Sequence, residues 1–346
     1  PEHVFEVLAG VAGGGVTVLG PRQEMSEPAA ADLVVFTSGT SGPPKGVRLS
    51  RANLEAAARA SAQHLGHGAE DRWLLAMPLH HVGGLSIVVR QAYTGGSVTM
   101  LDHFEPETFA LAMKADITMV SVVPTMLRRL IPFGPFDGLR AVLVGGGPIP
   151  DGLLEDAVAA GLPALPTYGM TETFGQVATL LPGTPIRRRA YPLPGVDLRV
   201  GPDGRIAVRG AQVSAGYVGE PDRADPWLVT NDLGEIDDDG ALHVLGRADT
   251  VIVTGGENVS PERVEASLRA LPGVDEAVVV GVPDDEWGRM VACAFSGTAD
   301  PEALRDMLAD SLPAWMIPKR FVVVTAIPRT SIGKPDRSAV EALFQI

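Results

Sequence analysis

Cysteine is almost absent from this sequence: Cys293 is the only one among 346 residues. No disulfide can form within the chain, which excludes a small disulfide-stapled scaffold and favours a reducing compartment. Cys293 stands in the apolar run 290–295. That setting is typical of a small buried side chain and not of a nucleophile.

Long apolar runs and a secretory signal are also lacking. No apolar stretch reaches the length needed to cross a bilayer. The first residues show no basic segment followed by an apolar one, so no signal peptide is predicted. We therefore expect a soluble, cytoplasmic protein without a membrane span. The sequence leaves the oligomeric state open, and a homodimer is among the options.

Basic residues are fewer than acidic ones. The sequence has 28 Lys and Arg against 42 Asp and Glu, a formal net charge of −14. A protein that binds the nucleic-acid backbone normally carries the opposite sign, so nucleic acid is not expected as a partner. Any phosphate must then be bound locally, by a few well-placed donors. Hydrophobic residues make up 45% of the chain, which is enough for a substantial core.

Strand-like and helix-like segments alternate in the first half of the chain. Apolar runs at 33–36, 117–123 and 139–144 predict buried strands. Segments 50–64 and 151–160 predict helices, and Ser50 is placed to cap the first of them. This alternation is typical of an α/β core with several parallel strands.

Beyond about residue 182 the pattern changes to short alternating pieces. The turns at 202–204 and 238–240 predict antiparallel hairpins. Near residue 249 a small α+β unit begins, with Ser260 as the cap of its first helix. We predict an α/β protein with a large domain, 1–248, built from mixed β-sheets, helices and a β subdomain. A small mobile α+β domain, 249–346, follows it.

A loop rich in glycine and hydroxyl groups follows the first buried strand and precedes the capped helix. Its residues include Thr37, Ser38, Gly39, Thr40, Ser41, Gly42 and Lys45. Glycines let the backbone approach an anion, hydroxyl and N–H groups donate to phosphate oxygens, and lysine adds positive charge. The Walker pattern of a P-loop NTPase fails at Pro44 and Gly46. A flexible linker is the other alternative, and it fits a place between a strand and a helix poorly.

The stretch 37–46 resembles the phosphate loop of the adenylate-forming superfamily. That family includes acyl-CoA synthetases, the adenylation domains of peptide synthetases and the luciferases. Single motifs of this kind are weak signals. Further segments occur here in the family's order, however, and the resemblance covers residues 33–337. It implies that the loop residues bind ATP.

The second segment is Tyr168-Gly169-Met170-Thr171-Glu172, which alone would be interpreted as a loop. The resemblance implies that Tyr168 packs on adenine, Thr171 contacts the α-phosphate and Glu172 holds Mg²⁺. A metal and fixed donors stabilise the charge that builds up when a carboxylate attacks a phosphate.

Gly145, Gly146 and Gly147 end a predicted strand, and by themselves they fit a tight turn equally well. The resemblance places them beside adenine and the acyl pocket. It assigns Gly146 and Gly147 to ATP, and Gly145, together with Gly169 and Met170, to the acyl substrate.

Asp232 lies in a Thr-Asn-Asp-Leu-Gly segment that resembles one whose Asp binds the ribose hydroxyls. The sequence departs from the family at Asn231, where Gly is usual. Asn is the residue besides Gly that best tolerates a positive φ. The resemblance also implies that Arg247 contacts the ribose and that Asp249 is a hinge. A turn acid and a surface charge pair are the alternatives.

Two further segments of the resemblance lie in the small domain. Gly255 and Gly256 resemble the loop that approaches the pantetheine of CoA, although glycines equally suit a plain turn. Lys334 resembles the family's catalytic lysine, which bridges the attacking carboxylate and the α-phosphate. An isolated lysine would otherwise be a solvated charge.

The neighbours His80 and His81 do not predict a metal site, because adjacent side chains diverge and no further ligand pattern accompanies them. The resemblance assigns His81 to the wall of the acyl pocket. His80 is interpreted as a packing residue.

The resemblance implies an AMP-forming acid–thiol ligase that uses ATP and Mg²⁺ and takes CoA as co-substrate. Within the family the chain is most similar to short o-succinylbenzoate–CoA ligases of menaquinone biosynthesis, and a small carboxylate is therefore the expected partner. Another acyl- or aryl-CoA ligase, a carrier-charging adenylation enzyme and a non-catalytic nucleotide-binding protein stay open as alternatives.

Overall fold

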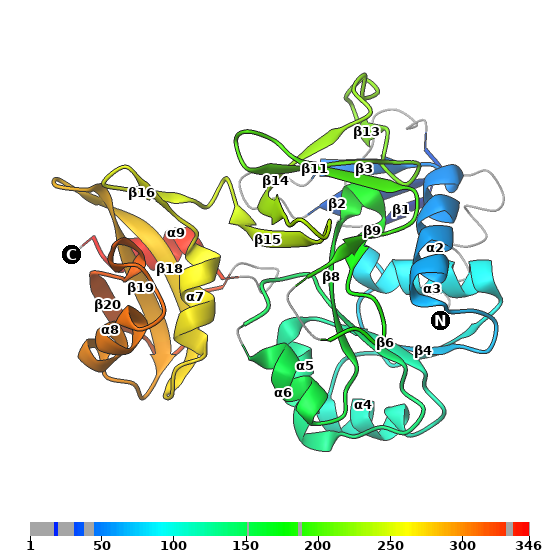
Figure 1. The fold of residues 1–346 in the computed structure, drawn as a ribbon, viewed down its shortest axis with the longest axis horizontal. Helices are drawn as coiled ribbons and strands as arrows, with labels where there is room; N and C mark the ends of the chain where they lie inside the picture. Colours follow the sequence, from blue (N-terminus) through cyan, green and yellow to red (C-terminus); the bar gives the residue numbers. More distant parts are fainter. Residues whose placement is uncertain are drawn as a thin grey trace. The chain divides into compact units, whose positions relative to one another are not determined.

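A seven-stranded sheet lies at the centre of the first part of the chain (Figure 1). Its strand order is β10-β9-β8-β7-β6-β4-β5, and the strands from β8 to β5 run parallel. The strands are β4 (Arg72–Leu75), β5 (Ser97–Met100), β6 (Met119–Val122), β7 (Ala141–Val144), β8 (Ala164–Met170), β9 (Gly175–Thr179) and β10 (Tyr191–Pro192). The expected parallel α/β core is therefore present. The computed structural model describes residues 17–19 as backbone, and 31–37, 45–150, 152–185, 189–329 and 335–345.

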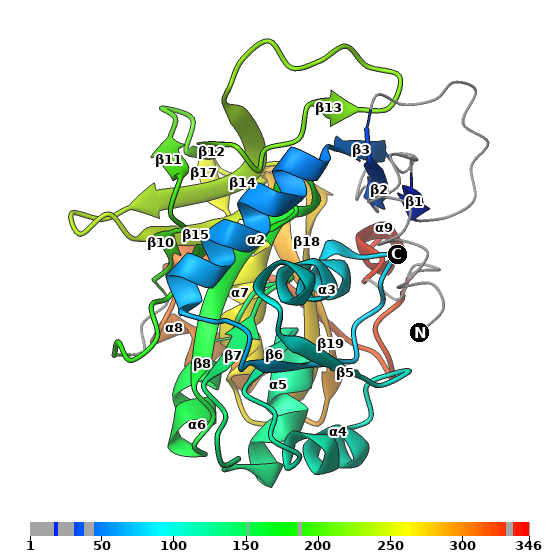
Figure 2. The same cartoon turned by 90° about the vertical axis from the view of Figure 1, so that its right-hand side faces the viewer.

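Helices cover this sheet. They are α2 (Arg51–Leu65), α3 (Val82–Thr94), α4 (Pro106–Met113), α5 (Pro124–Leu130) and α6 (Leu153–Ala159), with short 3-10 turns η1 (Ile131–Phe133) and η2 (Thr171–Thr173). Ser50 caps α2 as predicted, because its hydroxyl accepts from the Asn53 backbone N–H at 3.2 Å and Asn53 reciprocates. Helices α2 and α3 contact each other; they cross in Figure 1, and α3 lies below α2 in Figure 2.

A second, four-stranded sheet contains the first strand that the sequence predicted. Its order is β1 (Thr17–Leu19), β2 (Leu33–Thr37), β3 (Lys45–Leu49) and β13 (Gly216–Tyr217). Strand β3 was not predicted. Its polar residue Arg48 is 8% exposed, so the usual alternation of apolar and polar residues is missing. Leu33, Val35, Val47 and Leu49 pack against Leu54 of α2 and Leu85 of α3, which fixes the sheet to both helices.

The predicted hairpins form a third sheet, ordered β11-β12-β14-β15. These strands are β11 (Val196–Val200), β12 (Arg205–Gly210), β14 (Leu228–Ile236) and β15 (Leu242–Arg247). The turn at 202–204 joins β11 to β12, and Val200 pairs with Ile206. The buried side chains Ile206, Val208 and Leu242 belong to one apolar cluster with Val177 of β9.

The last part of the chain has its own core. Strands β18 (Val274–Asp284), β19 (Gly288–Gly297) and β20 (Arg320–Val323) form a sheet, preceded by the hairpin of β16 (Ile252–Thr254) and β17 (Glu257–Val259). Val279, Cys293 and Phe295 pack on the side of α7 (Pro261–Arg269) and α8 (Pro301–Ala309). Val278, Val280 and Ala294 pack on the side of α9 (Arg337–Ala342) and its successor Phe344. Cys293 is buried, as its apolar setting predicted, and burial raises the pKa of its thiol.

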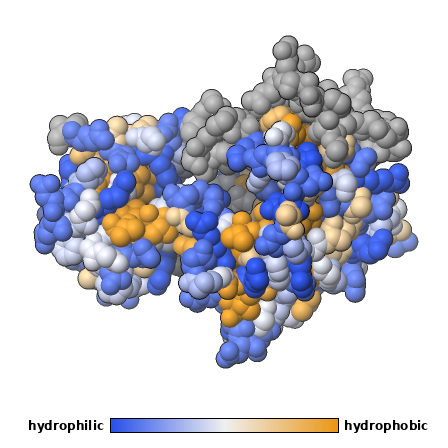
Figure 3. All heavy atoms as spheres, turned by 90° about the horizontal axis from the view of Figure 1, so that it is seen from above, coloured by the Kyte–Doolittle hydropathy of each residue, from blue (hydrophilic) through white to orange (hydrophobic). Residues whose placement is uncertain are grey.

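The chain divides into two compact units, each with a core of its own. Unit 1 is Pro1–Gly147, Leu153–Thr230 and Glu235–His243, and unit 2 is Pro148–Gly152, Asn231–Gly234 and Val244–Ile346. Within the described residues no helix has both the length and the apolar character needed to span a bilayer. Hydrophilic residues dominate the face seen in Figure 3, with smaller apolar areas between them.

Candidate active site

The two ends of the predicted phosphate loop are joined to each other in unit 1. Thr37 ends β2, Lys45 begins β3, and the two residues face each other across the antiparallel pair. The Thr37 hydroxyl donates to the Lys45 carbonyl at 3.3 Å. Ser38, Gly39, Thr40, Ser41 and Gly42 lie outside the described residues. The loop therefore links the two strands of a hairpin. The sequence had suggested instead that it leads straight into a helix. A Walker loop joins a strand to a helix, so this topology also argues against a P-loop NTPase.

The segment from Tyr168 to Glu172 is partly strand. Tyr168, Gly169 and Met170 continue β8, whereas the sequence suggested a loop. Thr171 and Glu172 then form the turn η2. Gly169 is required at its place, because a side chain there would collide with the carbonyl of Gly175 on β9. The segment therefore presents its residues from the end of a strand and from a hydrogen-bonded turn.

Glu172 is held at both its side chain and its backbone. Its carboxylate Oε1 accepts a hydrogen bond from the Tyr217 hydroxyl at 2.8 Å. Its carbonyl accepts from the Ser214 backbone N–H at 2.7 Å. Burial raises the pKa of Tyr217, and the nearby charge of Glu172 raises it further. The phenol therefore stays protonated and donates to the carboxylate.

Lys45 reaches the same tyrosine from the end of the predicted phosphate loop. Its Nζ lies 4.9 Å from the centre of the Tyr217 ring, within cation–π range. It also forms an exposed ion pair with Glu220 at 3.6 Å. Tyr217 thus joins the two predicted motifs, with Glu172 at its hydroxyl and Lys45 at its ring. Sequence reasoning missed this residue.

The glycine turn and the histidine pair follow parallel strands of the large sheet. Gly145, Gly146 and Gly147 come directly after β7, and the Gly145 N–H donates to the Val122 carbonyl at 3.2 Å. His81 is the residue before α3, in the segment that follows β4. Carboxyl ends of parallel strands share one edge of a sheet, where α/β proteins commonly bind ligands. His80 is exposed, and its ring centre lies 4.3 Å from that of His81 with the two rings tilted by 50°. We had interpreted His80 as a packing residue, but it does not pack into the core.

Arg90 is a second residue that sequence reasoning missed. It lies on α3, is 4% exposed, and burial lowers its pKa to about 9. Its guanidinium lies 5.6 Å from the Trp73 ring, and a Cβ on Gly175 would approach its Nη2 to 3.3 Å. Among the described residues no carboxylate forms an ion pair with it. A buried guanidinium without a carboxylate partner is costly and favours an anionic ligand.

A cluster of charges in unit 2 contains three predicted residues. Arg247 donates to Asp249 through Nε at 2.8 Å and Nη2 at 2.6 Å. Its Nη1 lies 3.3 Å from the Asp232 carboxylate. The hydrogen bond to Asp249 is the largest effect that raises the pKa of Arg247. The structure therefore brings the predicted ribose ligands and the predicted hinge residue together.

Gly255 and Gly256 form the turn between β16 and β17. Both have positive φ, +57° and +87°. The Gly255 N–H donates to the Trp287 carbonyl at 3.0 Å, and a Cβ on Gly255 would meet the Trp287 ring at 2.7 Å. Nothing lies within 4 Å of a Cβ on Gly256. One glycine is therefore packed against an aromatic ring while the next is open to solvent.

Lys334 lies outside the described residues, but both flanks of its loop are described. Arg329 pairs with Pro335 in an antiparallel bridge, and the Asp336 N–H donates to the Pro328 carbonyl at 2.8 Å. Arg337 is bound to the buried Glu265 at 2.7 Å. Lys334 is thus three residues from an arginine that is anchored to helix α7.

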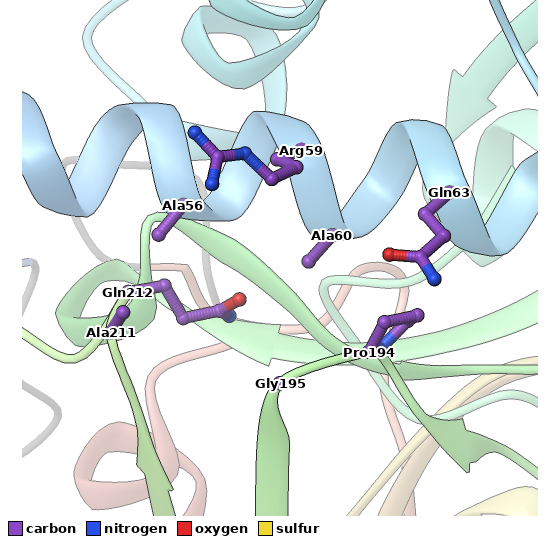
Figure 4. A pocket seen from close by; sticks show the side chains of 8 residues that line it. All are labelled: Ala56, Arg59, Ala60, Gln63, Pro194, Gly195, Ala211 and Gln212. Atoms are coloured by element: carbon purple, nitrogen blue, oxygen red, sulfur yellow. The ribbon is translucent and has the colours of Figure 1, made fainter.

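A separate cavity of unit 1 lies between α2 and the β subdomain. Figure 4 shows Arg59 and Gln63 projecting from α2, with Gln212 and Pro194 on the opposite side. The Arg59 Nε donates to the Tyr93 hydroxyl at 3.1 Å. None of the predicted site residues lines this cavity, so it belongs to the packing of α2 rather than to the candidate site.

Comparison with known proteins identifies the family of the chain. Residues 6–218 match the family model of the AMP-binding enzymes. The chain belongs to the AMP-binding enzyme family. Residues 263–334 match the model of the AMP-binding enzyme C-terminal domain. The resemblance to the adenylate-forming superfamily and the predicted fold class, a large α/β part followed by a small C-terminal domain, are both confirmed.

Two members of this family are especially similar, and one of them has been solved in two complexes. The 2-succinylbenzoate–CoA ligase of Bacillus licheniformis is 37% identical over 327 residues, which cover 88% of this chain and 68% of the relative. The o-succinylbenzoate CoA synthetase of Bacillus subtilis, solved with its acyl-adenylate intermediate, is 33% identical with a TM-score of 0.84, over 90% of this chain and 69% of that one. The same enzyme solved with ATP and magnesium also gives 0.84, at 30% identity over 97% and 81% of the two chains.

Proposed function

We propose that this chain is an ATP-dependent carboxylate–CoA ligase that works through an acyl-adenylate and acts on o-succinylbenzoate in menaquinone biosynthesis. The observation that carries the chemistry is the meeting of Glu172 and Lys45 at Tyr217. It unites a carboxylate suited to a metal with a cation at the end of a phosphate loop. The named relatives, o-succinylbenzoate ligases that match most of the chain, support the substrate.

Glu172 suits a magnesium ion that is shared with ATP. No cluster of three or more His, Cys, Asp and Glu side chains that could hold a metal occurs among the described residues. Mg²⁺ commonly binds one or two carboxylates and completes its shell with water and substrate phosphates. A single half-buried carboxylate with one oxygen already bound by Tyr217 fits that requirement. When bound, the ion would neutralise phosphate charge during adenylation.

The other residues have roles in the two half-reactions. Tyr168 holds adenine beside Gly146 and Gly147, Thr171 contacts the α-phosphate, and Thr37 to Gly42 with Lys45 hold the remaining phosphates. Asp232 and Arg247 bind the ribose. Lys334 bridges the carboxylate and the α-phosphate in the first step, which yields acyl-AMP and pyrophosphate.

A domain exchange separates the two steps. We propose a large domain, 1–248, and a small mobile domain, 249–346, with Asp249 as the hinge between them. After adenylation Lys334 leaves and the Gly255–Gly256 turn approaches, so that the CoA thiol attacks the mixed anhydride and AMP departs. One site serves two chemistries by exchanging the groups that line it.

The substrate assignment gains support from Arg90. o-Succinylbenzoate keeps a second carboxylate that does not react, and a buried cation that has no anionic partner among the described residues suits it. His81, Gly145, Gly169 and Met170 are the remaining residues of the acyl pocket in this proposal. Because the chain has a single, buried cysteine, a reducing cytoplasm also suits it.

The test is carboxylate-dependent release of pyrophosphate from ATP, with and without CoA, over a panel of acids. AMP, pyrophosphate and a CoA thioester are expected, with the highest rate for o-succinylbenzoate. A higher rate for another acid would keep the ligase and reject this substrate. ATP binding without release for any acid would overturn the ligase and favour a nucleotide-binding protein. ADP and phosphate as products would contradict adenylation.

A further inference from the structure

The segment 214–223 of unit 1 is bound to both motifs of the proposed ATP site. The Ser214 N–H donates to the Glu172 carbonyl at 2.7 Å. Three residues later, Tyr217 pairs with Val47 of β3, and the Val218 N–H donates to the Gly46 carbonyl at 2.8 Å. One short segment therefore connects the turn that carries Glu172 with the strand that follows the phosphate loop.

The far end of this segment is fixed as well. Arg48, which is 8% exposed, donates from Nη2 to the Glu220 carbonyl at 3.2 Å and forms an ion pair with Asp222 at 2.8 Å. The Arg223 N–H donates to the Ala215 carbonyl at 2.8 Å, and this hydrogen bond joins the two ends of the segment. With both ends fixed, the Tyr217 ring has little freedom to leave its place.

The Tyr217 side chain determines how Glu172 is presented. Its hydroxyl donates to Oε1 of the carboxylate at 2.8 Å, and among the described residues no hydrogen bond or ion pair occupies Oε2. A carboxylate that accepts a hydrogen bond from a fixed donor loses rotational freedom. Its other oxygen stays available for a cation. The same ring lies beneath the ammonium of Lys45. Removing the hydroxyl would release the carboxylate and leave the ring in place.

We propose that Tyr217 is a positioning residue that orients the Glu172 carboxylate toward the magnesium ion of the bound Mg·ATP. The proposal rests on the proposed function, because it takes Glu172 as a ligand of that ion. Tyr217 does not touch the reacting atoms. It acts through Glu172. In other proteins, residues that hydrogen-bond to a metal ligand orient that ligand in the same way.

The experiment compares Tyr217→Phe with the wild type in the full chain. Mn²⁺ replaces Mg²⁺ as a spectroscopic probe, and its binding to the enzyme with ATP, without any carboxylic acid, is followed by electron paramagnetic resonance. We expect Mn²⁺ binding to weaken about 10- to 100-fold, as for other residues that support metal ligands. ATP binding in the presence of EDTA should change less than about twofold, since Tyr217 contacts Glu172 and not the nucleotide.

Two further variants make the comparison specific. Tyr93→Phe is the matched control, because the Tyr93 hydroxyl also has a charged partner, Arg59, but on the exposed surface of α2 and α3. It should leave Mn²⁺ binding unchanged. In a Glu172→Gln background, Tyr217→Phe should add less than about a twofold loss, because the two residues act as one unit.

An unchanged Mn²⁺ affinity in Tyr217→Phe would overturn the proposal, as would an equal loss of ATP binding in EDTA. An additive loss in the Glu172→Gln background would overturn it too, because Tyr217 would then act on another group. Wild-type enzyme that binds Mn²⁺ and ATP but releases no pyrophosphate with any acid would instead overturn the proposed function.

Discussion

Arg247 binds Asp249 by two hydrogen bonds, at 2.8 and 2.6 Å, and extends its third nitrogen to within 3.3 Å of Asp232. One guanidinium thus connects the proposed hinge to a proposed ribose ligand. Lysine has the same charge but lacks the planar fork needed to make all three contacts. The geometry at this position therefore matters more than the charge.

Arg247→Lys should raise the KM for ATP about tenfold, the effect of one lost charge-assisted hydrogen bond. Its stability should fall by less than about 1 kcal/mol, because the pair is partly exposed. Steady-state kinetics and thermal unfolding measure both. Arg209→Lys is the control, since Arg209 also makes two hydrogen bonds to one aspartate, Asp197, on an exposed strand. An equal rise in KM for both variants would contradict the ribose assignment.

Lys334→Ala should slow acyl-adenylate formation by about 10²–10³-fold, the usual loss for one transition-state donor. Thioester formation from supplied acyl-AMP should stay close to the wild-type rate, because in the proposed domain exchange Lys334 has left the site before this step. Rapid-quench measurement of each half-reaction tests this, with Lys114→Ala, at the exposed end of α4, as the control. Equal losses in both half-reactions would refute the domain exchange.

Arg90→Met should separate stability from selectivity. Methionine removes a buried charge that has no ion-pair partner among the described residues, so the melting temperature should hold or rise. The KM for o-succinylbenzoate should rise at least about tenfold. The KM for a benzoate without the second carboxylate should change little.

The contrasting variant is Arg140→Met. Arg140 binds Asp71, which is 3% exposed, at 2.7 and 2.8 Å. Its loss leaves the buried Asp71 carboxylate without its cation. Arg140 is itself half exposed and Asp71 keeps hydrogen bonds from Gly68 and Thr118, so unit 1 should be destabilised by about 1–3 kcal/mol. If Arg90→Met were as destabilising as Arg140→Met, Arg90 would be a structural residue and not a ligand.

His67 should make the fold sensitive to mild acid. Burial and the charge of Arg90 lower its pKa from 6.5 to about 4. The unfolded chain takes up the proton near 6.5 and the folded chain only near 4, so stability falls as the pH drops through this window. The loss approaches about 3 kcal/mol at the acid end. His64 contributes in the same direction, since burial lowers its pKa too.

His67→Gln should flatten this dependence, and His103→Gln, at an exposed position, should not. Urea unfolding between about pH 7 and about pH 4.5 measures the slope. Asp71 does not account for it, because the pKa of that carboxyl is lowered from 3.8 and it is protonated only in stronger acid. A slope in His67→Gln equal to that of the wild type would reject the assignment.

Features set by neighbours in the sequence were predictable. Ser50 and Ser260 cap their helices through residues three positions later, and the turn at 202–204 needs only its own residues. Most of the predicted strands were found because their signal is also local. A short apolar run in an α/β core has few conformations open to it besides a buried strand.

Features set by distant residues were not predictable. Tyr217 meets Glu172 across 45 positions of sequence, and no local pattern marks that hydrogen bond. Arg90 interrupts an apolar helix, where a charge normally indicates a solvated face. Strand β3 was missed because Arg48 is buried by partners more than 170 residues away. The continuation of β8 through Gly169 depends on its pairing with β9.

The hairpin that carries the phosphate loop makes this part of the fold modular. Its ends, Thr37 and Lys45, are paired with each other across the two strands. Doubling the length of such a loop costs only about 0.6 kcal/mol in closure entropy. Anion-binding loops of other lengths could therefore be grafted onto the same two strands, so the chemistry of the loop could change without refolding the hairpin.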